Sequence, residues 1–150
     1  MSLAPTKVSK ICLALLRIAV GWFLLYQGIT AVLDPEWSIK PMIHNADTLA
    51  EFYDPIEDSD YLPYVSYVFK GLYILVGGLI LLGLYVRPAA LVGIVMMLFL
   101  YFPLLTFPYV NRDYFIVDQH LLLAITLLYL YAERAGEVFG LGTRFKLSRH

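Results

Sequence analysis

The chain has 150 residues, of which 60% are hydrophobic and 15% are charged, and its formal net charge is −1. Soluble domains contain about 45–50% apolar and about 25% charged residues, so the composition excludes an ordinary soluble domain and predicts a small integral membrane protein. The near-neutral charge gives no basic footprint for a nucleic-acid partner. The single cysteine, Cys12, excludes an intramolecular disulfide and a multi-cysteine metal or redox site within one chain.

Uncharged runs predict four membrane-spanning helices, at residues 11–33, 63–85, 88–105 and 114–134. The first run is longer than the 7–15 apolar residues of a signal peptide, so we expect it to be retained. The fourth helix has two alternative starts. Asp118 as N-cap leaves about 15 residues, or about 22 Å, before Glu133, which is short for a bilayer of roughly 30 Å. Asp113 as N-cap gives about 31 Å, and we expect this start.

The segment 34–62 is the only long loop, and it is rich in aromatic, acidic and proline residues. Within it, residues 45–53 predict a short amphipathic helix with Leu49, Phe52 and Tyr53 on one face, lying on the outer membrane surface as a lid. The expected fold is therefore an all-α, integral membrane four-helix bundle, a single domain over residues 1–150, with one long outer loop carrying a short amphipathic helix.

The distribution of lysine and arginine predicts the orientation. Eight of these residues lie in the two terminal regions and the turn between the second and third helices, and three lie on the other side. This asymmetry favours a multi-pass protein of the plasma (inner) membrane with both termini in the cytoplasm. Ten of the twelve acidic residues then lie on the outer side.

Small residues at helical spacing indicate where the helices approach one another, because close backbone contact supports helix association in lipid. The repeats are Ala14, Gly21 and Gly28 in the first helix, Gly71 and Gly78 in the second, and Ala89 and Gly93 in the third. Arg17 lies three residues after Ala14 and four before Gly21, so it shares their inward face. Snorkelling to water, binding of a lipid phosphate or another anion, and pairing with Glu133 are the alternatives for this arginine.

Four polar residues, Gln27, Lys70, Asp118 and His120, lie about 6–10 Å from the outer ends of three predicted helices. Ionisable groups at membrane depth are costly and point to function. The alternatives are a structural Lys70–Asp118 ion pair with His120 hydrogen-bonded to a neighbour, a ligand or proton-transfer site with Tyr26 nearby, and snorkelling of these side chains to water. Asp118 and His120 are two residues apart, hence about 200° apart around a helix, so each needs a partner on another helix. No metal or haem is expected, since only His120 lies within a span.

Five segments resemble the DoxX/DoxD family: Leu16–Gly28, Leu33–Ser38, Leu82–Ala90, Val117–Leu121 and Ala135–Leu141. The resemblance covers roughly residues 12–141. It implies a four-helix membrane protein linked to membrane redox systems, whose DoxD branch is a subunit of thiosulfate:quinone oxidoreductase. Family members often carry lysine in a G-x-x-K pattern after the first-helix glycine, where this chain has Ala31.

The expected function is therefore that of a quinone-linked membrane redox component similar to thiosulfate:quinone oxidoreductase. In this hypothesis His120 and Asp118 are the catalytic residues, and Gln27, Lys70, Tyr26 and Arg17 bind the quinone. Besides the lipid bilayer, the expected partners are an oxidoreductase subunit that supplies electrons and a second copy of the chain. A non-catalytic anchor or assembly subunit is the main alternative, and a small-solute transporter is the other.

Overall fold

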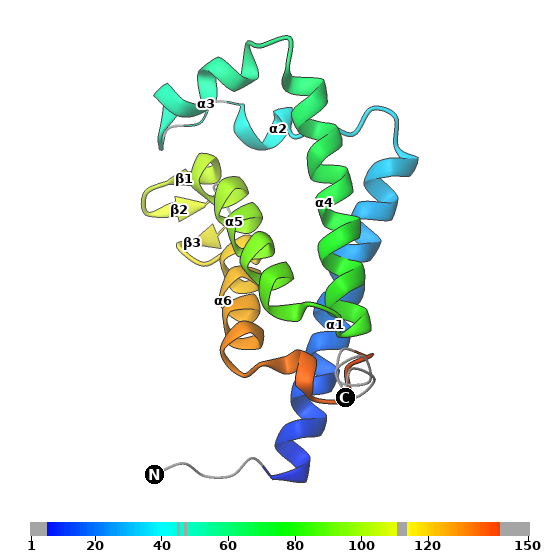
Figure 1. The fold of residues 1–150 in the computed structure, drawn as a ribbon. Helices are drawn as coiled ribbons and strands as arrows, with labels where there is room; N and C mark the ends of the chain where they lie inside the picture. Colours follow the sequence, from blue (N-terminus) through cyan, green and yellow to red (C-terminus); the bar gives the residue numbers. More distant parts are fainter. Residues whose placement is uncertain (1–5, 45, 47, 111–113, 142–150) are drawn as a thin grey trace.

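The computed structural model describes residues 6–44, 46, 48–110 and 114–141 (Figure 1). Its elements are α1 (Lys7–Leu33), α2 (Lys40–Ile43), α3 (Ala50–Glu57), α4 (Leu62–Leu82), α5 (Val86–Leu104), β1 (Leu105–Thr106), β2 (Tyr109–Val110), β3 (Tyr114–Phe115), α6 (Gln119–Ala132) and the 3-10 turn η1 (Ala135–Glu137). Helices α1, α4 and α5 are long and apolar enough to cross a membrane, and α6 is a shorter apolar helix. The all-α membrane fold is confirmed.

Helices α1 and α4 form an antiparallel pair whose backbones nearly touch at glycines. A Cβ added to Gly21 would lie 2.5 Å from the backbone nitrogen of Leu81, and one added to Gly28 would lie 2.7 Å from that of Ile74. A Cβ on Gly77 would meet the backbone of α1. The inward stripe expected on the first helix is therefore confirmed.

The prediction for Gly71 and Gly78 is wrong, because a Cβ on either would meet nothing within 4 Å. A seven-residue spacing places residues on one helix face, but it does not say which face is covered. The contact with α1 is made instead by Gly77, about 100° around the helix from Gly78. Gly71 and Gly78 therefore face open space beside α4.

Helices α5 and α6 form a second antiparallel pair, which joins the first mainly through contacts between α4 and α5. At the α5–α6 contact, a Cβ on Gly93 would lie 2.9 Å from Cδ1 of Leu127, and Ala89 is buried. Ala89 and Gly93, the small residues of the third predicted helix, therefore pack as expected. The bundle consists of two helix pairs rather than four equivalent neighbours (Figure 1).

The expected start of the fourth helix is wrong. Residues 114–115 form strand β3, and α6 begins after Asp118, whose extended backbone (φ −112°, ψ −176°) and side chain cap the helix. The expected cap, Asp113, lies outside the described residues. With 14 residues, α6 is about 21 Å long. The small antiparallel sheet β1–β2–β3 occupies the connection between α5 and α6.

The loop between α1 and α4 folds into a cap over the end of the bundle (Figure 1). The amphipathic helix expected at residues 45–53 is displaced, because Leu49 adopts a left-handed backbone conformation (φ 60°) and α3 begins after it. Tyr53 is buried, whereas Leu49 and Phe52 are exposed, so the three do not share one covered face.

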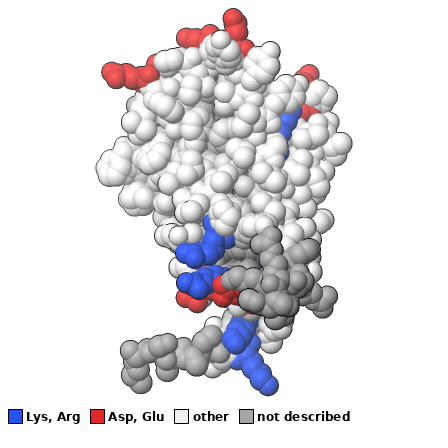
Figure 2. Space-filling view, viewed as in Figure 1, with Lys and Arg blue, Asp and Glu red and all other residues white. Residues whose placement is uncertain are grey.

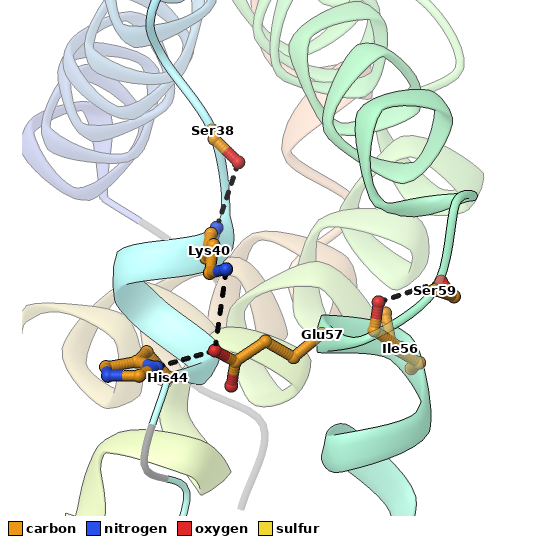
Figure 3. A network of polar contacts seen from close by, with 6 residues as sticks. All are labelled: Ser38, Lys40, His44, Ile56, Glu57 and Ser59. Carbon is orange, nitrogen blue, oxygen red and sulfur yellow. Dashed lines mark hydrogen bonds and ion pairs between the residues drawn. The ribbon is translucent and has the colours of Figure 1, made fainter.

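Polar contacts tie α2 to α3 (Figure 3). Nδ1 of His44 lies 2.5 Å from Oε1 of Glu57, and Nζ of Lys40 lies 3.9 Å from the same oxygen. The Lys40 backbone nitrogen also donates to Oγ of Ser38 at 3.1 Å. Because exposed ion pairs contribute roughly 0–1 kcal/mol, these contacts orient the cap more than they stabilise it.

Tyr53 attaches this cap to α5 through a hydrogen bond that Pro103 makes necessary. In a helix, the carbonyl of residue 99 accepts from the N–H of residue 103, and proline has none. The Tyr53 hydroxyl donates to the Phe99 carbonyl at 2.9 Å instead. Thr48 Oγ1 similarly donates to the Leu105 carbonyl at 2.5 Å. The cap thus satisfies backbone groups at the end of α5.

The charged side chains separate along the bundle (Figure 2). On the face shown, acidic side chains gather at the end that carries α3, and basic side chains gather mainly at the opposite end. Four exposed acids belong to the cap and the start of α4: Glu51, Asp54, Asp58 and Asp60. The long apolar surface between the two ends is the part that suits lipid.

Candidate functional site

Asp118 and His120 form a hydrogen-bonded pair at the start of α6. Oδ1 of Asp118 accepts from the Leu121 backbone nitrogen at 2.9 Å, and its Oδ2 lies 2.6 Å from Nδ1 of His120. The two side chains are only 6% and 14% exposed. The expectation that they point apart is wrong, because it assumed that both residues lie inside a helix. One carboxylate therefore caps α6 and orients the imidazole.

The printed hydrogen bond of the imidazole is made by Nδ1, at the ring edge that faces Asp118. Among the described residues, no hydrogen bond reaches Nε2 of His120. The loop before the pair is held by Tyr101 on α5, whose hydroxyl donates to the Ile116 carbonyl at 2.7 Å. The pair is thus positioned by α5 and α6.

Lys70 lies away from this pair, at the junction of α4 and the loop after α1. Its Nζ donates to the Asp34 carbonyl at 3.1 Å, which caps the C-terminal end of α1. The ammonium also lies 5.6 Å from the Trp37 ring centroid and 5.3 Å from that of Tyr67. Lys70 and Asp118 do not form an ion pair, so the structural pair, one of the two alternatives for these residues, is not observed.

Arg17 lies near the opposite end of the bundle from Lys70 and is 3% exposed. Its Nη1 donates to the carbonyls of Ala135 at 2.8 Å and Val138 at 2.7 Å, and its Nη2 to that of Phe139 at 3.4 Å. Within the part of the chain that the structure describes, its Nε has no hydrogen-bond partner. Of the alternatives for Arg17, snorkelling to water is excluded by its burial, and pairing with Glu133 is not observed, because Arg17 forms no ion pair among the described residues. Backbone dipoles stabilise this charge instead, and the arginine holds the segment after α6 against α1.

Glycine makes room for this arginine. Gly83, which ends α4, has a φ of +72°, and a Cβ there would lie 3.0 Å from Nη1 of Arg17 and 2.7 Å from Cα of Gly140. A side chain at position 83 would therefore be both strained and obstructed. The inward position of Arg17 was predictable from spacing, whereas its carbonyl partners, more than a hundred residues later in the chain, were not.

The four polar residues expected in one pocket do not come together. Lys70 lines one cavity, and Asp118 and His120 form a separate pair. Gln27 is half-buried on α1 and does not line the Lys70 cavity, and Tyr26 is 56% exposed and stacks on Trp22. Equal depth placed these residues in one layer but gave no information on which sides of the helices they occupy.

The sequence reasoning missed Ser66 and Trp37. Ser66 lies one helical turn before Lys70, a spacing that places both on one face of α4, and it is 4% exposed. Its Oγ donates to the Leu62 carbonyl and accepts from the Ile39 backbone nitrogen. Trp37 belongs to the loop after α1, and no periodicity could have placed it beside Lys70.

Comparison with known proteins gives one match. A family model described as DoxX matches residues 12–105, which is more than half of the chain. No curated protein matches the chain. No solved structure matches it.

Proposed function

Because the chain belongs to the DoxX family, we propose that it is a quinone-linked component of a membrane redox system in which His120 exchanges a proton with the quinone. The observation that carries this proposal is the Asp118–His120 hydrogen bond of 2.6 Å at Nδ1, while Nε2 has no hydrogen-bond partner among the described residues. Histidine is the residue type that changes charge between pH 5 and 8. A proton donor or acceptor is most effective when it changes charge near the ambient pH.

Each residue of the pair has a defined role in this proposal. The Asp118 carboxylate accepts the Nδ1 proton, so the neutral ring presents Nε2 as the acceptor. A bound quinone supplies the redox chemistry by taking up two electrons and two protons. His120 holds or gives up a proton at Nε2, and Asp118 positions the ring and stabilises its charged form. Asp118 is thus a positioning residue.

The described residues have the polar and apolar chemistry that a quinone requires. His120 supplies one polar contact for a head group. An open apolar groove of about 440 Å³ between α4 and α5, which neither Asp118 nor His120 lines, suits an isoprenoid tail. The groove is lined mainly by Leu72, Leu91, Val92, Val95 and Met96, with Phe69 and Phe99. Gln27, Lys70, Tyr26 and Arg17 do not join this site. Since one cysteine cannot form a dithiol, we propose that a partner oxidoreductase subunit supplies the electrons.

A non-catalytic anchor or assembly subunit is the second candidate. Lys70 and Arg17 support it, because both buried cations hydrogen-bond to backbone carbonyls that end or follow helices. In that case the intramembrane charges serve folding. The two candidates differ at His120, which the anchor does not need for any reaction.

We also propose that the basic end of the bundle faces the cytoplasm of a plasma membrane, in line with the positive-inside rule. Single cysteines at Lys7 and Asp58, in a chain without Cys12, test this orientation. An impermeant thiol reagent applied to intact cells is expected to label position 58 alone. Labelling of position 7 alone would show the reverse orientation.

Quinone reduction by purified variants, with electrons supplied by the partner oxidoreductase subunit, tests the proposed roles. His120→Gln is expected to lower kcat by about 100-fold, the scale of general acid–base catalysis. Asp118→Asn keeps an N-cap oxygen for Leu121 but cannot accept from Nδ1, so it is expected to lower kcat while KM stays near the wild-type value. Gln119→Ala, at an exposed side chain between them, is the matched control. Unchanged kcat in both variants would favour the anchor.

A further inference from the structure

The cavity beside Lys70 is an open-sided recess of about 180 Å³ with both polar and apolar lining residues. It lies where the loop after α1 meets the first two turns of α4. Its lining residues are Pro35, Glu36, Trp37, Ser38, Leu62, Pro63, Ser66, Tyr67 and Lys70. Neither Asp118 nor His120 lines this cavity, and the proposed redox role does not use it.

The cation in this cavity is incompletely satisfied. Lys70 is 6% exposed, and its ammonium has three N–H groups. One donates to the Asp34 carbonyl, and the Trp37 and Tyr67 rings supply cation–π contacts. Among the described residues no carboxylate lies within 4.0 Å of Nζ. A desolvated cation without a counter-charge favours a ligand that brings negative charge and acceptor oxygens.

The same cavity also carries a negative charge. Glu36 lines it with an exposed side chain, and its carboxylate does not pair with Lys70. Its backbone nitrogen is held by Oδ1 of Asp34 at 2.9 Å, which fixes the turn after α1. Two opposite charges that line one recess without pairing complement a ligand that carries both charges itself. A simple anion would be repelled by Glu36.

The position of the cavity points to a lipid. The α1–α4 register places Lys70 beside the end of α1, one helical turn beyond the contact of Gly28 with Tyr73 and Ile74. Toward the other end of the bundle, both helices expose apolar residues. Exposed tyrosines Tyr61, Tyr64 and Tyr67 lie at or above this level, as expected of an aromatic belt at a membrane–water interface.

We infer that the Lys70 cavity binds the head group of a zwitterionic phospholipid that has a primary amine, of the phosphatidylethanolamine type. The phosphate lies at Lys70 Nζ, the amine lies toward Glu36, and the acyl chains follow the apolar surface of the bundle. Phosphate is the shared chemistry of a lipid and a free ion. The amine and the chains distinguish them.

Lipid retention by purified protein in nanodiscs and in detergent, followed by native mass spectrometry, tests this inference. Wild type is expected to retain phosphatidylethanolamine in preference to phosphatidylglycerol, and to bind neither inorganic phosphate nor free phosphoethanolamine with comparable affinity. Lys70→Met is expected to weaken retention about tenfold or more, the factor for one charge-assisted hydrogen bond. Lys40→Met, an exposed lysine outside the cavity, is the control.

Glu36→Gln separates this site from a general folding effect, because its side chain is exposed and Lys70 also caps α1. This variant is expected to keep the fold and to lose the preference for phosphatidylethanolamine over phosphatidylglycerol. If Lys70→Met does not fold, the result for Glu36→Gln decides whether the cavity binds this head group. Equal retention in wild type and Lys70→Met, equal binding of inorganic phosphate, or replacement of the phospholipid by a Lys70-dependent quinone would each overturn the inference.

Discussion

Replacing Tyr53 by phenylalanine tests how the cap is joined to the bundle. The substitution keeps the buried ring and removes only the hydroxyl that donates to the Phe99 carbonyl at 2.9 Å. A buried acceptor left without its donor costs about 1–3 kcal/mol. Pro103 leaves no backbone donor for this carbonyl, so we expect the free energy of unfolding to fall by this amount.

The matched background is Pro103→Ala, which supplies an N–H for the same carbonyl. In that background Tyr53→Phe is expected to cost about 0.5 kcal/mol or less, which gives an interaction energy of roughly 1 kcal/mol in a double-mutant cycle. Unfolding of the four proteins by SDS titration, followed by far-UV circular dichroism, measures it. Equal costs of Tyr53→Phe in the two backgrounds would refute the reasoning.

The pH dependence provides an independent check of this contact. Burial raises the pKa of the Tyr53 phenol above its ordinary value of 10.0. A raised pKa means that the protonated phenol is favoured in the folded state, so its contribution is fully present below about pH 10 and is lost as the pH rises through the raised value. The stability difference between wild type and Tyr53→Phe is therefore expected to be constant at neutral pH and to shrink only in alkali.

Two further pairs of variants test the packing of the bundle. Gly77→Ala is expected to destabilise the protein by about 1–3 kcal/mol, because the added Cβ meets the α1 backbone. Gly78→Ala, whose Cβ would enter open space, is expected to be neutral or to stabilise the protein by about 0.5–1 kcal/mol. Equal unfolding midpoints of the two variants would contradict this packing. Arg17→Met is expected to lower the free energy of unfolding by about 3 kcal/mol or more. It is also expected to expose a cysteine placed at Val138 to a thiol reagent, whereas the control Lys10→Met is not. A protected thiol in the Arg17 variant would contradict the role of Arg17 in holding the segment after α6 against α1.

Helix-breaking residues and helical spacing correctly predicted the end of α1 and its buried face. The end of α1 at Asp34–Pro35 and the buried stripe of Gly21 and Gly28 follow from proline sterics and helical spacing. The start of α6 did not follow, because the reasoning required each helix to cross a full bilayer. The structure uses the segment between α5 and α6 for a small sheet, so α6 can be short.

The candidate site shows the same division. The residue types Asp118 and His120 were found, but their hydrogen bond was missed because it depends on Asp118 lying outside the helix. An ion pair with Asp118 was one alternative for Lys70, whereas Lys70 contacts Trp37 and the Asp34 carbonyl in a loop without periodicity. Depth along a helix is readable from sequence, but side-chain partners across helices require the rotation of each helix.

The most direct test of the central claim is whether the purified protein binds a quinone at the Asp118–His120 pair. Wild type extracted in mild detergent is expected to carry quinone at up to one molecule per chain, or to bind added quinone at about 10–100 μM, a range typical of enzyme substrates. His120→Gln is expected to weaken that binding or to lower kcat by about 100-fold, while Gln119→Ala is expected to do neither. Wild type that carries no quinone and binds none in this range would contradict the redox function and leave the anchor.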